Sequence, residues 1–265
     1  MIYAYMLEIQ LPPLAEETIV EFIKSFLNGK KGIIGMSGGI DSTLVAYLAN
    51  KAAPGKIIGI HMPEIESSND DEKDAREFAE KIGIDFRVFN IEKFISPFRE
   101  IYNDRKILGN IKARIRMVVL YSIANKENAL VIGASNKSEL LTGYFTKYGD
   151  GASDLMPIGD LYKTQVKLLA RKVGLPEKVI NKVPTAGLWP GQRDEDELGI
   201  DYFTLDKVLY GIELLMDDLR ISEETGVNLE TVNRIRKMVE ISRHKRVLIY
   251  IPKVSIRTVG LDFRE

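Results

Sequence analysis

The sequence predicts an α/β fold: a doubly wound parallel sheet with helices on both faces. Four short apolar runs, at residues 31–34, 56–61, 86–90 and 129–133, alternate with segments whose apolar residues recur at helical spacing. Elements that alternate in this way form parallel sheets, because each crossover helix returns the chain to the edge at which the next strand starts. A length of 265 residues with 45% apolar residues suits one large domain with a sizeable core.

The helices between and after these strands follow from spacing and start signals. Ser68 is followed by acidic residues, which favour the first turn of a helix, and Gly29 stands where a helix would end. Helices are expected at residues 15–28, 42–51, 68–82, 92–102, 110–125, 161–173, 177–182, 205–217 and 229–242, with a short tail from residue 247. On the helix at 110–125, Lys112, Arg114 and Arg116 would suit a solvated edge.

A glycine-rich loop, residues 35–43, connects the first strand to the helix that follows it. Strand, glycine-rich turn and helix together aim backbone N–H groups and a helix N-terminus at an anion. The glycines permit close approach of a phosphate, and Ser37 and Ser42 add hydroxyl donors. Asp41 would repel phosphates unless a divalent cation lay between them, so it implies magnesium. The alternatives are a tight turn without a ligand and an acid placed only to favour the helix start.

A second polar segment, residues 134–139, follows the fourth strand and contains Glu139. In the commonest doubly wound order, the first and fourth strands are neighbours, and the binding crevice opens between their carboxyl ends. We therefore expect Asp41 and Glu139 to converge on this crevice.

Two long loops depart from the regular pattern. Residues 141–154 are polar, aromatic and glycine-rich, and residues 183–195 contain the only tryptophan of the chain. Loops of this length inside a compact domain are usually functional or mobile. Tyr144, Phe145 and Trp189 could stack on an aromatic ring of a ligand, or could equally anchor these loops.

Composition narrows the function further. The net charge of −1 provides no overall basic field for nucleic acid, and the absence of cysteine excludes thiol nucleophiles and thiolate metal sites. The first residues lack the pattern of a signal peptide, and no apolar run approaches the length of a membrane span. A cytoplasmic protein without nucleic-acid or membrane partners is expected.

The glycine-rich loop resembles the SGGxDS signature of the PP-loop ATP pyrophosphatases, whose fold is Rossmann-like, of the adenine nucleotide alpha hydrolase type. With the other segments included, the chain resembles the ammonia-dependent NAD synthetases over nearly its full length. The segments that carry this resemblance, in the order of the family, are residues 35–43, 109–117, 133–139, 143–154, 157–163, 185–189 and 244–246.

The resemblance implies a ligase. ATP would adenylate the nicotinate carboxylate of deamido-NAD and release pyrophosphate, and ammonia would then displace AMP to give NAD, with Mg²⁺ as cofactor. It further implies a homodimer and a single NAD synthetase domain over residues 1–265. Glutamine-dependent relatives carry an added domain with a cysteine nucleophile, and this chain has neither the length for a glutaminase domain nor a cysteine, so ammonia is the expected nitrogen donor.

The resemblance also assigns roles to residues of this chain. Asp41, Ser37 and Lys163 are implied to be catalytic, and Asp41 and Glu139 to bind the metal. The implied ATP-binding residues are Gly35, Met36, Ser37, Gly38, Gly39, Ile40, Asp41, Ser42, Ala134, Lys163 and Thr185. The implied deamido-NAD-binding residues are Arg114, Lys147, Asp154, His244 and Lys245.

Two positions depart from the family pattern. Ala134 and Arg193 both stand where the family usually has threonine, so the ATP contact of a hydroxyl at position 134 is lost or passes to Ser135. One alternative is another PP-loop ATP pyrophosphatase that amidates or adenylates a different acceptor. The other is a regulatory module that holds ATP without turnover.

Overall fold

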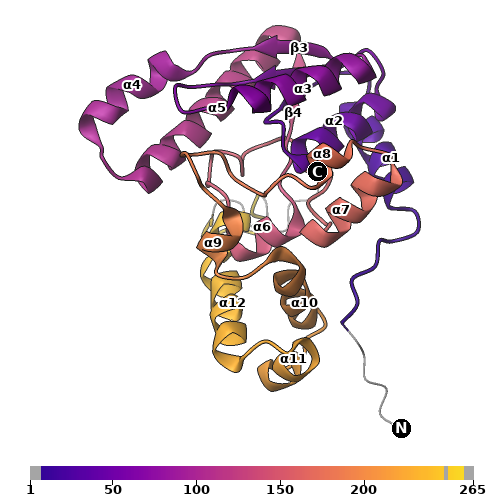
Figure 1. The fold of residues 1–265 in the computed structure, drawn as a ribbon, viewed down its shortest axis with the longest axis vertical. Helices are drawn as coiled ribbons and strands as arrows, with labels where there is room; N and C mark the ends of the chain where they lie inside the picture. Colours follow the sequence, from indigo (N-terminus) through magenta and orange to yellow (C-terminus); the bar gives the residue numbers. More distant parts are fainter. Residues whose placement is uncertain (1–6, 248–249, 260–265) are drawn as a thin grey trace.

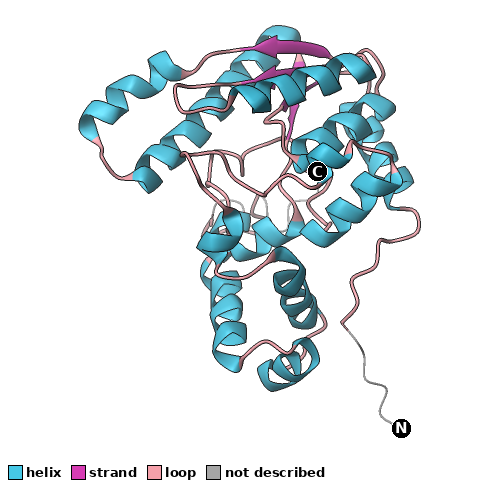
Figure 2. Cartoon of the chain, in the orientation of Figure 1, coloured by secondary structure: helices cyan, strands magenta, loops and turns pink. Residues whose placement is uncertain are grey.

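The computed structural model describes residues 7–247 and 250–259. Its centre is a parallel sheet of β1 (Lys31–Gly35), β2 (Ile57–His61), β3 (Asp85–Val88) and β4 (Ala129–Ile132), in the order β3-β2-β1-β4 (Figures 1 and 2). Ile33 of β1 is level with Ile58 on one side and with Val131 on the other. The expectation that the first and fourth strands are neighbours is therefore confirmed.

The chain after β4 extends the sheet by one bridged residue pair. Leu155 forms an isolated parallel bridge with Ile132, and its carbonyl accepts from the N–H of Gly133 at 2.8 Å. This bridge lies where a fifth strand would stand in the commonest doubly wound order, and it brings the end of the long 143–154 loop back to the strand ends.

Helices cover both faces of the sheet, as predicted. Alternate residues of each strand point to opposite faces, so Ile34 and Ile33 belong to different hydrophobic clusters. The Ile34 face is covered by α1 (Ala15–Leu27), α2 (Ile40–Ala52), α3 (Asn69–Ile82), α7 (Lys163–Lys172) and α8 (Glu177–Ile180). The Ile33 face is covered by α4 (Glu92–Ile101) and α5 (Arg105–Glu127).

A helical lobe lies beyond the sheet and is seen below it in Figure 1. Its elements are α9 (Asp194–Leu198), α10 (Tyr202–Glu213), α11 (Asp218–Thr225), α12 (Leu229–Ile241) and α13 (Arg243–Arg246). Side chains of α10, α11 and α12 form a third core that also contains Tyr162, which precedes α7. Short α6 (Lys137–Thr142) contributes Leu141 to the edge of this core, so the lobe packs against the elements that follow β4.

Several predicted boundaries were wrong, each for a local reason. The helix expected at 205–217 ends at Glu213, because Leu215 has a φ of 57° and Asp217 caps a new helix by accepting from the N–H of Arg220 at 3.0 Å. The first helix stops at Leu27, because the left-handed cap conformation is already taken by Asn28, one residue before Gly29. Within the described residues, no helix combines the length and hydrophobicity needed to cross a membrane.

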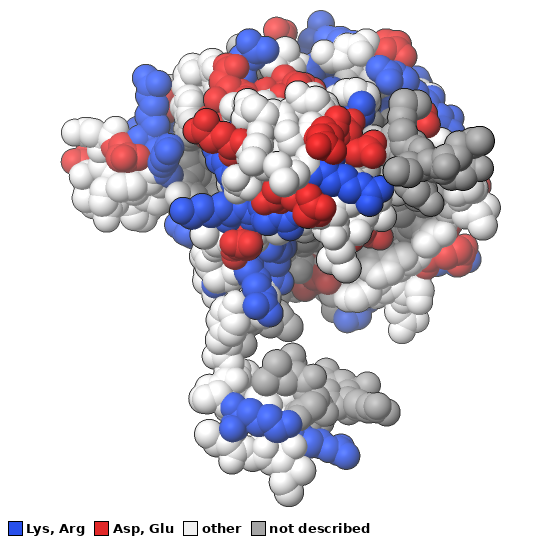
Figure 3. Space-filling model, turned by 90° about the horizontal axis from the view of Figure 1, so that it is seen from below, with Lys and Arg blue, Asp and Glu red and all other residues white. Residues whose placement is uncertain are grey.

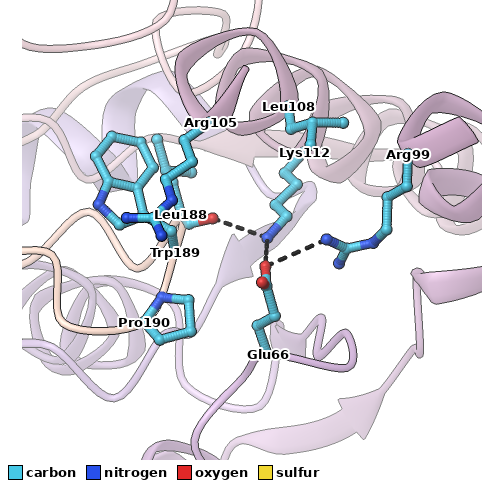
Figure 4. A pocket seen from close by; sticks show the side chains of 8 residues that line it. All are labelled: Glu66, Arg99, Arg105, Leu108, Lys112, Leu188, Trp189 and Pro190. Atoms are coloured by element: carbon cyan, nitrogen blue, oxygen red, sulfur yellow. Dashed lines mark hydrogen bonds and ion pairs between the residues drawn. The ribbon is translucent and has the colours of Figure 1, made fainter. Parts of the chain in front are cut away.

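The sequence left a solvated edge of α5 as an alternative, and Lys112 does not lie on one, since its exposed fraction is 1%. Its ammonium donates to Glu64 at 3.1 Å. It also donates to Glu66 at 2.6 Å and to the carbonyl of Leu188 at 2.8 Å, and these two bonds are drawn in Figure 4. Arg99 of α4 also bonds both glutamates. Acidic partners from the segment after β2 make burial of the lysine possible. This network ties α5 to the 183–193 loop beside a cavity of about 150 Å³, which Trp189 and Pro190 help to line.

We predict that Lys112→Met lowers the free energy of unfolding by about 3 kcal/mol, because it leaves the buried carboxylate of Glu64 with fewer donors. Urea unfolding of wild type and variant measures the difference. Lys51→Met is the control, since its ion pair with Glu16 lies at the surface and should contribute little. Equal stability of Lys112→Met and wild type would contradict the prediction.

Candidate active site

Hydroxyl groups form hydrogen bonds within the glycine-rich loop after β1 and fix its conformation. Ser42 Oγ accepts from the N–H of Ser37 at 3.3 Å, lies 3.1 Å from Ser37 Oγ and is 3.2 Å from the carbonyl of Gly39, to which it donates. Gly38 has a φ of +76°, and a Cβ there would lie 2.6 Å from the carbonyl oxygen of Asp71. Glycine is therefore required at this position. The loop leads into the N-terminus of α2, where the helix dipole favours an anion.

The neighbouring strand fixes the start of the loop. Met36 N–H donates to the carbonyl of Ile60 at 2.9 Å, and Met36 carbonyl lies 2.8 Å from Nδ1 of buried His61. A Cβ at Gly59 would meet the Met36 sulfur at 2.4 Å, so the absence of a side chain there lets Met36 lie against β2. These contacts set the direction in which the chain leaves β1.

Lys163 lies between two carboxylates at the predicted crevice. Its ammonium is 2.5 Å from Asp41 Oδ2 and 3.7 Å from Glu139 Oε1, while its side chain is 3% exposed. Asp41 comes from the first turn of α2, Glu139 from the first turn of α6 and Lys163 from the start of α7. Three residues from three elements thus meet at one point, as the strand order predicts for the two acids.

Electrostatics within this cluster are unbalanced. Burial and the negative charge of Asp41 raise the pKa of Glu139 well above its usual range, and the nearby ammonium of Lys163 only partly opposes this. The same two carboxylates raise the pKa of Lys163 against the effect of its burial. The lysine is therefore charged at pH 7, and one more positive charge would favour the ionised form of Glu139.

Asn136 orients both carboxylates, and sequence reasoning missed it. Its side-chain amide donates to Asp41 Oδ1 at 3.0 Å, and its side-chain oxygen accepts from the N–H of Glu139 at 3.1 Å. Glu139 in turn accepts from the N–H of Asn136 at 3.2 Å, which completes a capping box. The signal was present in the sequence as an asparagine three residues before a glutamate.

Asp194 and Tyr202 form a further layer around Lys163 that was also missed. Asp194 is buried, accepts from the N–H of Ala186 at 2.9 Å and from the hydroxyl of Tyr202 at 3.3 Å, and has its pKa raised by burial. The ammonium of Lys163 lies 5.2 Å from the centre of the Tyr202 ring. Asp194 therefore joins the 183–193 loop to the surroundings of the lysine.

The donor set suits a magnesium ion shared with phosphates. Asp41 and Glu139 provide hard oxygen atoms, and a bound cation would favour the ionised form of Glu139, which burial and Asp41 disfavour in its absence. Within residues 7–247 and 250–259, no group of three or more His, Cys, Asp or Glu residues is arranged to hold a metal. Two carboxylates alone would leave most of an octahedral shell to water and phosphate oxygens, which is the usual pattern for Mg²⁺ with nucleotides.

The residues expected to bind deamido-NAD lie mainly around the 143–150 loop. Exposed Arg114 of α5 donates to the carbonyl of Lys147 at 3.3 Å, and the Lys147 ammonium lies 5.2 Å from the Tyr148 ring centre. Lys245 of α13 donates to the carbonyls of Gly143 at 2.6 Å and Phe145 at 2.8 Å. The structure thus gathers three predicted cations on one loop that begins where α6 ends.

Other predicted residues lie apart from these groups. Asp154 accepts from the backbone N–H of Val131 at 2.7 Å and from the hydroxyl of Tyr121 at 3.2 Å, so its carboxylate is bonded to the sheet edge and to α5. His244 is exposed, and Ala134 packs partly against the core. Thr185 is exposed and accepts from the N–H of Gly187 at 3.0 Å, within its own loop.

The aromatic side chains that sequence left open have structural contacts. Phe145 is buried under the ammonium of Lys245, 5.3 Å from the ring centre. Trp189 lies over Gly109 of α5, where a Cβ would meet its ring at 3.3 Å. Both anchor loops in the free protein. Arg193, which stands where the family usually has threonine, precedes α9 and forms an ion pair at 3.8 Å with exposed Asp196.

Charge on the face seen in Figure 3 is mixed, with acidic and basic side chains side by side. That face therefore has no continuous basic surface, in agreement with the net charge of −1.

Comparisons with known proteins agree with this geometry. A sequence model described as NAD synthase matches residues 16–249. An NH(3)-dependent NAD(+) synthetase of Pyrococcus furiosus is 50% identical over 243 residues, which cover 89% of this chain and 93% of the relative.

Solved structures give the same result. An NMN synthetase from Francisella tularensis matches with a TM-score of 0.81 and 33% identity over 92% of this chain and 100% of its own. An NH3-dependent NAD synthetase from Campylobacter jejuni subsp. jejuni NCTC 11168, in complex with nitrate, matches with a TM-score of 0.76 and 29% identity over 90% and 98% of the two chains. Together with the strand order and the loop after β1, these matches show that the chain belongs to the NAD synthase family.

Proposed function

We propose that this chain is an ammonia-dependent NAD synthetase. ATP adenylates the nicotinate carboxylate of deamido-NAD with release of pyrophosphate, and ammonia displaces AMP to give NAD. The observation that carries the proposal is the main cluster, which consists of Lys163, Asp41 and Glu139 and lies beside the loop after β1. The chain belongs to the NAD synthase family.

The chemistry explains why such a cluster is needed. A carboxylate at pH 7 resists attack by ammonia, because it is already negative and would have to lose an oxide. Conversion to a mixed anhydride with AMP supplies a good leaving group. The protein must therefore stabilise the charge that develops on the departing pyrophosphate and hold two nucleotides in line.

Each element of the site has a part in this scheme. The N–H groups and hydroxyls of Ser37 and Ser42, with the N-terminus of α2, would bind the β and γ phosphates. Asp41 and Glu139 would hold Mg²⁺, which supplies positive charge to the phosphate oxygens. Lys163, released from those carboxylates, would donate to the phosphate whose charge grows during departure.

The second substrate would lie toward the 143–150 loop. Arg114, Lys147 and Lys245 place three cations around this loop, and a dinucleotide carries two phosphates. The expected ligand contacts of Asp154, His244 and Thr185 stay predictions. These residues form no described contact with the three cations of the 143–150 loop or with Lys163, Asp41 and Glu139.

We also propose a homodimer located in the cytoplasm. Support for the dimer comes from exposed apolar side chains on α4 and α5, among them Ile101 at 68% exposure and Val118 at 69%. Exposed apolar side chains on two helices that pack against each other are compatible with an interface.

The proposed function is tested by incubating the protein with ATP, Mg²⁺, deamido-NAD and an ammonium salt, followed by mass spectrometry. We expect NAD, AMP and pyrophosphate in equal amounts. Glutamine in place of ammonia should give no NAD, since the chain has no cysteine nucleophile.

Nicotinate mononucleotide is the informative alternative substrate, because an NMN synthetase shares this fold. A much higher kcat/KM for the mononucleotide would overturn the choice of dinucleotide. Binding of ATP without turnover of either substrate would instead favour the regulatory module.

Asp41→Asn is expected to lower kcat by about a hundredfold or more, because the amide cannot balance the charge of a metal–phosphate cluster. Steady-state kinetics at saturating ATP measures the loss. Asp85→Asn makes the same chemical change in an exposed ion pair with Arg87 and should leave kcat unchanged. Equal kinetics of the two variants would remove Asp41 from the site.

A further inference from the structure

Helix α10 of the lobe places a fully buried carboxylate between α6 and α7. Asp206 has an exposed fraction of 0%. Its Oδ1 accepts from the hydroxyl of Ser138 on α6. Its Oδ2 accepts from both the backbone N–H and the hydroxyl of Thr164 on α7, each at 2.7 Å. The carboxylate is thus bonded to two helices that come from other parts of the chain.

The partners of Asp206 are the immediate neighbours of the residues in the main cluster. Ser138 precedes Glu139, and Thr164 follows Lys163. Ser138 Oγ, while it donates to Asp206, also accepts from the backbone N–H of Lys163 at 2.9 Å. One carboxylate therefore fixes, through one hydroxyl and one N–H group, the backbone from which both functional side chains extend.

The start of α7 shows why this arrangement needs an outside acceptor. The first N–H groups of a helix have no partner within it, and a serine, threonine or aspartate cap usually accepts from them. Tyr162 stands at the cap position of α7, and its hydroxyl bonds Glu213 instead, at 2.6 Å. Ser138 and Asp206 accept from the first two N–H groups in its place.

The donors around Asp206 favour its ionised, accepting form, although its burial does not. Burial raises its pKa to about 6, while the donors of Ser138 and Thr164 oppose the rise. The positive end of the α7 dipole also favours the ionised form.

We propose that Asp206 is a positioning residue, which sets the separation between the Lys163 ammonium and the Glu139 carboxylate for the reaction proposed above. The inference rests on that proposed function. It gives the helical lobe a part in catalysis beyond the Tyr202 ring, because Asp206 lies outside the main cluster and acts through the Ser138 hydroxyl of α6 and the backbone of α7. A small displacement of a reacting group can cost a large factor in rate, so loss of this anchor should lower kcat.

The test compares Asp206→Asn with Glu213→Gln, a change of the same kind on the same face of α10. Glu213 bonds the side-chain tips of Lys137 and Tyr162 rather than the backbone beside Lys163. We expect Asp206→Asn to lower kcat by about 10–100-fold, with the KM for deamido-NAD little changed. Glu213→Gln should retain the kcat of wild type, and thermal unfolding shows whether each variant is folded.

Two further variants keep the outcome decisive. Ser138→Ala removes the hydroxyl between Asp206 and the Lys163 N–H, so its loss of kcat should not add to that of Asp206→Asn in the double variant. Thr164→Val deletes a single bond to Asp206 and serves if Asp206→Asn fails to fold; it should lower kcat by a smaller factor.

The affinity for ATP with Mg²⁺, measured by calorimetry, tests the role of Asp206 independently of whether the protein makes NAD. We expect binding about tenfold weaker in Asp206→Asn and unchanged in Glu213→Gln. If wild type makes no NAD, the proposed function fails, and the binding comparison still decides the role of Asp206. Folded Asp206→Asn with the kcat and ATP affinity of wild type, equal losses in both α10 variants, or additive losses with Ser138→Ala would each overturn the inference.

Discussion

The contact between the buried ammonium of Lys163 and the carboxylates of Asp41 and Glu139 is the interaction on which the rest of the site depends. An ammonium and two carboxylates taken out of water are costly unless they compensate one another. One positive charge cannot balance both acids when they are ionised, and the raised pKa of Glu139 shows that its protonated form is favoured as a result. A site with this deficit favours a divalent cation, and a cation in turn draws phosphates.

The fold brings these charges together by means of its topology. Because β1 and β4 are neighbours, the segments that follow them meet at one edge of the sheet, and α2 and α6 begin there. The Asn136 capping box joins the two acids, and the first turn of α7 adds the lysine. On the other side of the crevice, buried Lys112 holds the 183–193 loop by its Leu188 carbonyl, while Asp194 ties the same loop to the surroundings of Lys163.

Much of this could be predicted from the sequence, because the signals are local. The four strands are short apolar runs, the glycine-rich loop after β1 is a continuous motif, and the meeting of Asp41 with Glu139 follows from a common strand order. Asp217, which caps α11, is a local signal too, but the predicted helix at 205–217 extends to this residue and no helix is predicted at 218–225.

What the sequence could not provide depends on partners far away in the chain. Lys112 is buried only because Glu64 and Glu66 reach it from 48 and 46 residues away. Asp206 stands on an amphipathic helix where an acid suggests a solvated face, and its partners lie 68 and 42 residues away. Lys163 and Asp41 are likewise 122 positions apart in the sequence, and no local pattern predicts their contact.

The most direct measurement is a crystal structure of the protein with Mg²⁺ and an ATP analogue that has a methylene group between its α and β phosphorus atoms. If Lys163 neutralises the two acids only until a nucleotide binds, the metal will be found on Asp41 and Glu139, with the lysine ammonium on a phosphate oxygen near Ser37. Phosphates bound elsewhere, with the ammonium still on Asp41 and no metal on either acid, would contradict this exchange.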